Sequence, residues 1–191
     1  MKSFLLIVLA AAPAMGARKN PVQAFLPQWR DGQAWAVEYS IRSPSAAGVE
    51  NPPDEIMKEI WEYSLLRPKD GADGWNLKIW ERNFENNGYY SVVFSTSLGV
   101  LKVLRFGPDG QAHQVFNDSE KGDYRSDSTR APLLDWPAWS SGVAENGAWV
   151  FRFDVPGRDG YHERIRWLKN SPWWFQAERS YGAVAVKARL L

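Results

Sequence analysis

Two glutamates lie in strand-like, tryptophan-containing segments and are the best candidates for acid–base chemistry in this chain. Glu38 lies in the alternating stretch 33–42, and Glu62 lies in the stretch 58–66. Two carboxylates roughly 5 to 9 Å apart across a cleft suffice for glycoside hydrolysis. We expect both side chains on the face opposite the large aromatic residues, where the simpler interpretation is a solvated glutamate on a strand.

The residues around Glu38 provide a local likeness. The run Val37-Glu38-Tyr39-Ser40-Ile41 resembles the nucleophile strand of small jelly-roll xylanases. The likeness implies a carbohydrate-binding or glycoside-hydrolysing module. It covers five residues only, and the second glutamate motif of that family is missing, because Glu178 lacks its context. Hydrolysis is therefore an alternative hypothesis, and we expect a protein without enzymatic activity.

Other catalytic and metal-binding patterns are weak. The chain has two histidines and no cysteine. Neither His113 nor His162 has a second histidine at a ligand spacing, whereas a zinc site needs three or four ligands. The sequence contains no Gly-x-Ser-x-Gly elbow, and its glycine-rich turns do not open helices that could bind phosphate. We therefore expect neither a metal nor a cofactor.

Tryptophan is the unusual component, with 11 residues in 191. Such a surplus indicates a thick aromatic core, a lined cleft or both. Trp136 and Trp139 lie near Pro137, and Trp173 and Trp174 follow a turn, so these four are the predicted ligand-binding residues. Because Trp173 and Trp174 are adjacent, in a strand they would point to opposite faces of the sheet.

The first residues predict export. Lys2 precedes the apolar run 4–12, and Pro13 and small residues follow, which is typical of a signal peptide over residues 1–16. Residues 17–24 are expected to form a flexible lead. The predicted location is periplasmic or extracellular, with no transmembrane segment after cleavage. Removal of Lys2 leaves 22 basic against 22 acidic residues, so net charge gives no attraction to nucleic acid.

Alternating hydrophobicity predicts one β domain over residues 25–191, with about nine or ten antiparallel strands and little helix. Residues 54–60 fit either a helix or a strand, and we favour a strand from about Lys58. Residues 117–142 form a polar loop followed by an aromatic flap. The expected strands lie near 33–42, 58–66, 75–79, 89–97, 99–106, 111–116, 149–155, 161–167, 173–178 and 183–190.

The order of signal peptide, strand meander, flap and further strands resembles the periplasmic half-barrel proteins of the lipoprotein-carrier type. That resemblance implies a curved antiparallel sheet, a half-barrel or barrel, that holds acyl chains on its concave face. The leading hypothesis is a non-enzymatic exported protein that binds an apolar or amphipathic, lipid-like ligand in a Trp-lined concavity. The alternatives are the carbohydrate-active module and a structural or interaction domain of the cell envelope. The sequence predicts neither the oligomeric state nor a protein partner.

Overall fold

The computed structural model describes residues 21–43, 55–68, 73–84, 87–117, 131–154 and 160–191. Within them the chain forms an eleven-stranded sheet and two short 3-10 turns, η1 (Pro21–Ala24) and η3 (Trp139–Ser141). The strands are β1 (Ala34–Ser43), β2 (Glu55–Leu66), β3 (Trp75–Glu81), β4 (Tyr89–Phe94), β5 (Val100–Phe106), β6 (Ala112–Asn117), β7 (Val143–Glu145), β8 (Ala148–Asp154), β9 (His162–Leu168), β10 (Gln176–Tyr181) and β11 (Val184–Leu190).

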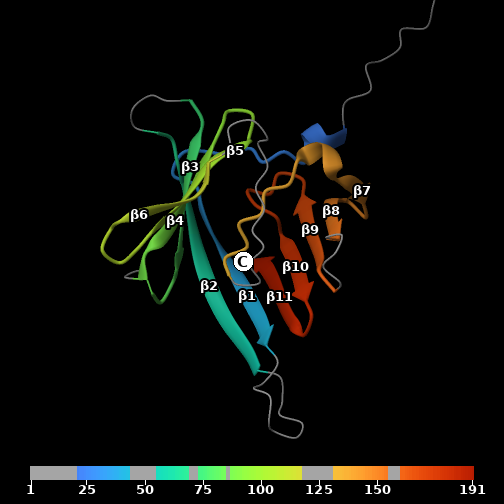
Figure 1. Ribbon diagram of the computed structural model, residues 1–191. Helices are drawn as coiled ribbons and strands as arrows, with labels where there is room; N and C mark the ends of the chain where they lie inside the picture. Colours follow the sequence, from blue (N-terminus) through green and yellow to red (C-terminus); the bar gives the residue numbers. More distant parts are fainter. Residues whose placement is uncertain (1–20, 44–54, 69–72, 85–86, 118–130, 155–159) are drawn as a thin grey trace, which may run out of the picture.

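All strands belong to a single antiparallel sheet in the order β6-β5-β4-β3-β2-β1-β11-β10-β9-β8-β7. The sheet consists of two meanders, β1–β6 and β7–β11, joined where β1 pairs with β11. Figure 1 shows the sheet curving so that the β3–β6 arm and the β7–β10 arm lie on either side of β1 and β2. The sheet is open, since β6 and β7 are its edges. The predicted mainly β half-barrel is confirmed, with eleven strands instead of nine or ten.

The alternation predicted for β1 is observed. Trp35, Val37, Tyr39 and Ile41 are buried on the concave, inner face, while the residues between them are less buried and face outward. β2 pairs with β1 from Ser43↔Glu55 to Ala34↔Ser64. Because the pairing continues to Glu55, residues 55–60 are strand and not helix, and β2 begins before Lys58.

The inner face is covered by two segments that are not part of the meanders. One is the flap, which we define as residues 131–142, and the other is the segment 21–33. Figure 1 shows the flap passing between the two arms of the sheet. The flap buries Leu133, Leu134 and Trp136, and the first segment buries Phe25 and Trp29. The flap therefore packs on the inner face of the sheet.

One detail of the predicted strands is wrong. Trp173 and Trp174 do not lie in a strand, because β10 begins at Gln176. Both rings are buried, with 1% and 0% of the residue exposed, and their centroids are 6.2 Å apart. Pro172 before them has no backbone N–H for a ladder, and the chain enters the strand only after both indoles have packed.

Several expectations lie outside the described residues. The signal peptide at 1–16, residues 17–20 of the lead and residues 118–130 of the polar loop belong there. The last residues of the lead form η1. No helix in the described ranges is long and apolar enough to cross a membrane.

Candidate functional site

The four tryptophans predicted to bind a ligand meet in one cluster between the flap and the sheet. Trp136 is 1% exposed and stands at the centre of the cluster. The rings around it belong to the segment 21–33, to β4, to the flap itself, to β9 and to the segment before β10. Their centroids lie 4.8–5.8 Å from that of Trp136, and the residues are Trp29, Phe94, Trp139, Trp167 and Trp173. We call this set with Trp35 and Trp174 the aromatic interior.

The indole N–H groups in the aromatic interior and at the neighbouring Trp149 fall into two sets. Those of Trp29, Trp149 and Trp167 donate to backbone carbonyls, at 2.7, 3.1 and 3.3 Å. Five others are buried and have no acceptor among the described residues: Trp35, Trp136, Trp139, Trp173 and Trp174. A buried donor without a partner costs roughly 1–3 kcal/mol, and edge-to-face contacts between rings offset only part of it. The interior therefore contains a concentration of donors without acceptors.

A buried ion pair joins the flap to the sheet. The guanidinium of Arg179 on β10 donates to the carboxylates of Asp135 in the flap and, at 2.7 Å, of Glu163 on β9. The side chains of Arg179 and Glu163 are 0% and 1% exposed, and that of Asp135 is 2% exposed. Burial alone would lower the pKa of Arg179, but Asp135 and Glu163 outweigh it and hold the pKa above its ordinary value. Arg179 is thus a buried, charged residue of the inner face that binds the flap.

Two tyrosines extend this polar cluster. The hydroxyls of Tyr39 on β1 and Tyr63 on β2 lie 2.7 Å apart, and the backbone N–H of Leu133 donates to the Tyr39 hydroxyl at 3.2 Å. Burial is the main cause that raises the pKa of both hydroxyls. Both therefore stay protonated, and the Tyr39 hydroxyl holds the flap backbone as a neutral group.

The flap is attached to the sheet mainly through side chains. Apart from a single bridge at Trp136, no flap residue in the described range belongs to a strand ladder. Its fixed points are the Asp135–Arg179 pair, the Leu133–Tyr39 hydrogen bond and the bond from Trp149 Nε1 to the Trp139 carbonyl. The pairings of the eleven strands therefore do not run through the flap.

Glu38 and Glu62 lie on the outer face, as expected. Their cross-strand partners are Ile60 and Ala36, so the two carboxylates are diagonal neighbours on adjacent strands. Each is held by an arginine: Arg189 Nε lies 3.0 Å from Glu38, and Arg82 Nε lies 2.5 Å from Glu62. A groove of about 400 Å³ is lined by Glu38 but not by Glu62. This geometry does not set the two carboxylates across a cleft from one another.

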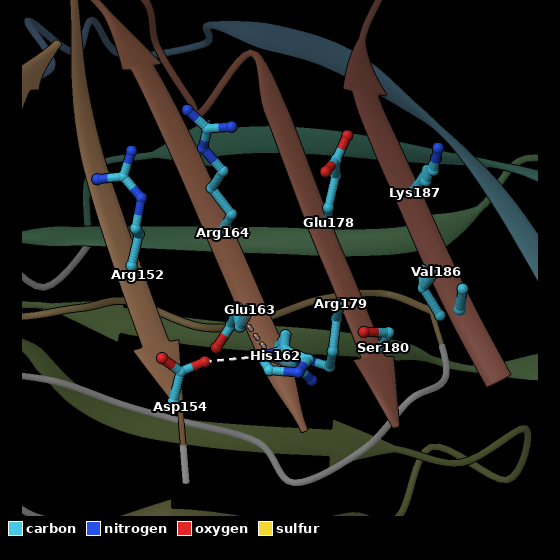
Figure 2. Close-up of a pocket in the computed structure, with 11 residues that line it drawn as sticks. Arg152, Asp154, His162, Glu163, Arg164, Glu178, Arg179, Ser180, Val186 and Lys187 are labelled. Atoms are coloured by element: carbon cyan, nitrogen blue, oxygen red, sulfur yellow. Dashed lines mark hydrogen bonds and ion pairs between the residues drawn. The ribbon is translucent and has the colours of Figure 1, made fainter. Parts of the chain in front are cut away.

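A second groove, of about 330 Å³, lies over β8–β11, and its lining includes Glu163 and Arg179 beside residues of the outer face. Figure 2 shows Arg152, Arg164, Glu178 and Lys187 projecting to the same side from these four strands, where they are successive cross-strand partners. Arg152 and Arg164 also donate to Glu145. The hydrogen bond from Arg152, followed by the charges of the neighbouring arginines, lowers the pKa of Glu145. The surface is a row of charged side chains in which Arg152 and Arg164 are ion-paired with Glu145.

The same groove contains Asp154, His162 and Ser180 in line on β8, β9 and β10. His162 Nδ1 lies 2.7 Å from Asp154 Oδ1, as Figure 2 shows. However, the side chains of His162 and Asp154 are 69% and 80% exposed, and no described hydrogen bond links His162 to Ser180. A serine nucleophile needs that bond and an oxyanion hole, whereas the N–H groups of these paired strands serve the ladder. The line does not form a nucleophilic triad.

Metal binding is not supported by the described residues, since they contain no group of three or more histidine, cysteine, aspartate or glutamate side chains that could hold an ion. His113 lies on the edge strand β6 and is exposed.

Sequence reasoning missed the charged residues of the polar cluster, namely Asp135, Glu163 and Arg179. A usable pattern exists for two of them. Glu163 lies on the same face of β9 as Ile165 and Trp167, and Arg179 lies on the same face of β10 as Ala177. All of these positions belong to the inner face. A charged residue at an apolar position of a strand pattern indicates a buried ion pair or a site.

No model of a known protein family matches this chain. No curated protein matches it either.

Proposed function

We propose that this is an exported, non-enzymatic protein that binds an amphipathic, lipid-like ligand between the flap and the inner face of the sheet. The apolar body of the ligand packs against the aromatic interior, and its oxygen atoms accept hydrogen bonds from indole N–H groups. The observation that carries the proposal is the set of five buried indole donors without a described acceptor. A ligand with acceptor oxygens removes the cost of leaving those donors unpaired.

The construction of the flap supports the same function. Ligand sites are mostly apolar with a few polar groups that fix orientation, and the aromatic interior has that composition. The side chains of the flap fill this space in the present structure. The ligand would take the place of Trp136 while the strand ladder persists, since the flap is attached mainly through side chains.

A neutral hydrophobic dye, N-phenylnaphthylamine, tests the proposal. We expect saturable fluorescence enhancement with the wild-type protein and displacement by dodecanol. Trp173→Phe removes one indole donor from the sheet side of the interior and should weaken dodecanol binding severalfold. Trp80→Phe is the matched control, because Trp80 lies on the outer face opposite Glu62.

Two results would contradict the proposal. One is the absence of saturable dye and dodecanol binding at every concentration below the solubility limit of each compound. The other is an equal loss of binding in Trp80→Phe and Trp173→Phe. Either would leave the aromatic residues as a core alone, which corresponds to a structural domain of the cell envelope.

A further inference from the structure

The carboxylate of the flap residue Asp135 occupies a position beside Arg179 that would become empty when a ligand displaces the flap. Asp135 directly precedes Trp136, and both are buried, at 1% exposure each. A ligand that takes the place of Trp136 moves the flap and withdraws Asp135 from Arg179 at the same time. The Arg179 guanidinium, itself 0% exposed at the side chain, then loses an acceptor in a place that water reaches poorly.

We infer that the ligand carries a carboxylate head group that binds Arg179 in place of Asp135, so that Asp135 is an internal competitor for the site. The inference rests on the proposed function and specifies the ligand of that site as a long-chain carboxylic acid. The guanidinium presents a planar set of N–H donors that matches a carboxylate. Asp135 shows that this position accepts a carboxylate oxygen within hydrogen-bonding distance.

The charge balance favours a single negative charge on the head group. Glu163 is bonded to the same Arg179 nitrogen from β9, a strand that does not move with the flap. A ligand carboxylate therefore restores the charges that Asp135 and Glu163 present together. A phosphate monoester dianion would add a further negative charge beside Glu163, and an ammonium head group would face Arg179 directly and be repelled.

Tyr39 offers the second polar contact. Its hydroxyl accepts the Leu133 N–H in the closed arrangement and lies 2.7 Å from the Tyr63 hydroxyl. Asp135 and Arg179 both act electrostatically on Tyr39, so the phenol and the guanidinium belong to one cluster. When Leu133 moves with the flap, its N–H leaves the Tyr39 oxygen. The Tyr39 O–H can then donate to the second oxygen of the head group while the Tyr63 hydroxyl donates to Tyr39.

The experiment compares three ligands with the same tail, dodecanoate, dodecanol and dodecyltrimethylammonium, by displacement of N-phenylnaphthylamine near neutral pH. The full chain is used as wild type, Asp135→Asn and Glu38→Gln. Asp135→Asn removes the competing charge and keeps the shape of the side chain. Glu38→Gln is the matched control, because Glu38 also pairs with an arginine but on the outer face, where Arg189 is 66% exposed.

We expect the wild type to bind dodecanoate at least about tenfold more tightly than dodecanol and to bind dodecyltrimethylammonium most weakly. Asp135→Asn should tighten the binding of dodecanoate and of dodecanol by about tenfold, because both ligands displace Asp135 together with the flap, and the variant should keep the preference for dodecanoate. Glu38→Gln should change none of the three affinities. If Asp135→Asn binds dodecanoate and the wild type does not, Asp135 competes with the ligand for Arg179 more strongly than expected, and the inference holds.

The wild-type series needs no variant to fold, so the inference remains testable if Asp135→Asn is unstable. Equal affinities for dodecanoate and dodecanol in wild type, unchanged by Asp135→Asn, would overturn the carboxylate inference while leaving the amphipathic ligand in place. Binding of none of the three ligands by wild type or Asp135→Asn would overturn the proposed function itself.

Discussion

Asp135 in the flap and Arg179 on β10, 44 residues apart in the chain, form a buried ion pair that connects the covering segment to the inner face of the sheet. Glu163 completes the group from β9. Three charged side chains are thus held inside an otherwise aromatic core. Replacement of such a group by apolar residues is often neutral, whereas removal of one partner leaves a charge without compensation.

Removal of the shared cation should be the more damaging change to this group. Arg179→Met leaves Asp135 and Glu163 facing each other in a buried site, and we expect a loss of about 3–5 kcal/mol in the free energy of unfolding. Asp135→Asn keeps the Arg179–Glu163 pair and should cost about 1–3 kcal/mol. Urea unfolding followed by circular dichroism measures both. The outer-face control Glu38→Gln, whose partner Arg189 is 66% exposed, should stay within about 1 kcal/mol, and an Arg179→Met variant as stable as this control would refute the assignment.

Truncation of Trp136 should have a large effect on stability, because the ring fills the centre of the aromatic interior. Trp136→Ala should lower the free energy of unfolding by about 3–5 kcal/mol through lost burial and the cavity left behind. Trp80→Ala is the comparison, since Trp80 packs on the outer face with the Lys78 ammonium 5.3 Å from its ring and should cost about 1 kcal/mol. Thermal and urea unfolding measure the stability of the two variants. Similar losses in the free energy of unfolding would show that Trp136 is not the central contact.

The buried tyrosine pair predicts sensitivity to alkali. Burial raises the pKa of Tyr39 and Tyr63 above the ordinary value near 10. The stabilising contribution of each neutral hydroxyl is therefore fully present below about pH 10 and is lost as the pH rises toward the folded-state pKa. The double variant Tyr39→Phe, Tyr63→Phe should be less stable at neutral pH, because the Leu133 N–H loses its acceptor.

Above pH 10 the same double variant should lose stability less steeply than wild type, which urea unfolding at successive pH values measures. Tyr181→Phe is the control, since Tyr181 is 49% exposed, and its pH dependence should follow wild type. A double variant with the same alkaline slope as wild type would contradict the buried location of the pair.

Gly142, the last residue of the flap, should not tolerate a side chain. Its φ of −84° imposes no backbone strain on alanine, but a Cβ would collide with Nε1 of Trp149. That nitrogen donates to the Trp139 carbonyl at 3.1 Å, so Gly142→Ala should displace the indole and cost about 1–3 kcal/mol. The melting temperature and the near-ultraviolet circular dichroism report the change. Ser140→Ala, at an exposed position of η3, should leave the melting temperature and the spectrum unaltered. If Gly142→Ala also changed neither, the close contact of Gly142 with Trp149 would be excluded.

The fold class was predictable because most strands alternate cleanly. In β1 the burial of Trp35, Val37, Tyr39 and Ile41 follows directly from period two. The strand order was not predictable, since nothing local in β1 or β11 indicates that Val37 pairs with Leu190. The prediction that Trp173 and Trp174 lie in a strand was wrong for a related reason. Aromatic residues suit strands, but Pro172 and the packing of the two indoles place the start of β10 at Gln176.

The candidate site was only partly predictable. The flap and its tryptophans followed from composition, because such rings must pack against something. The partner of Asp135 could not be found from sequence, since the flap has no periodicity to show which way Asp135 points. Glu163 and Arg179 interrupt apolar inner-face patterns, and that interruption would have indicated a buried charge group without indicating its third member.

The connection of the two meanders through β1 and β11 has a consequence for how the polypeptide acquires its shape. Within each meander the pairings join neighbours in sequence and can form quickly. The pairing of Val37 with Leu190 closes a loop over nearly the whole chain and has to wait until both ends of that loop are free to meet. We expect the two arms to form early as separate, aggregation-prone half-sheets in which Tyr39 and Val186 are exposed. A chaperone that delays aggregation would act during that interval.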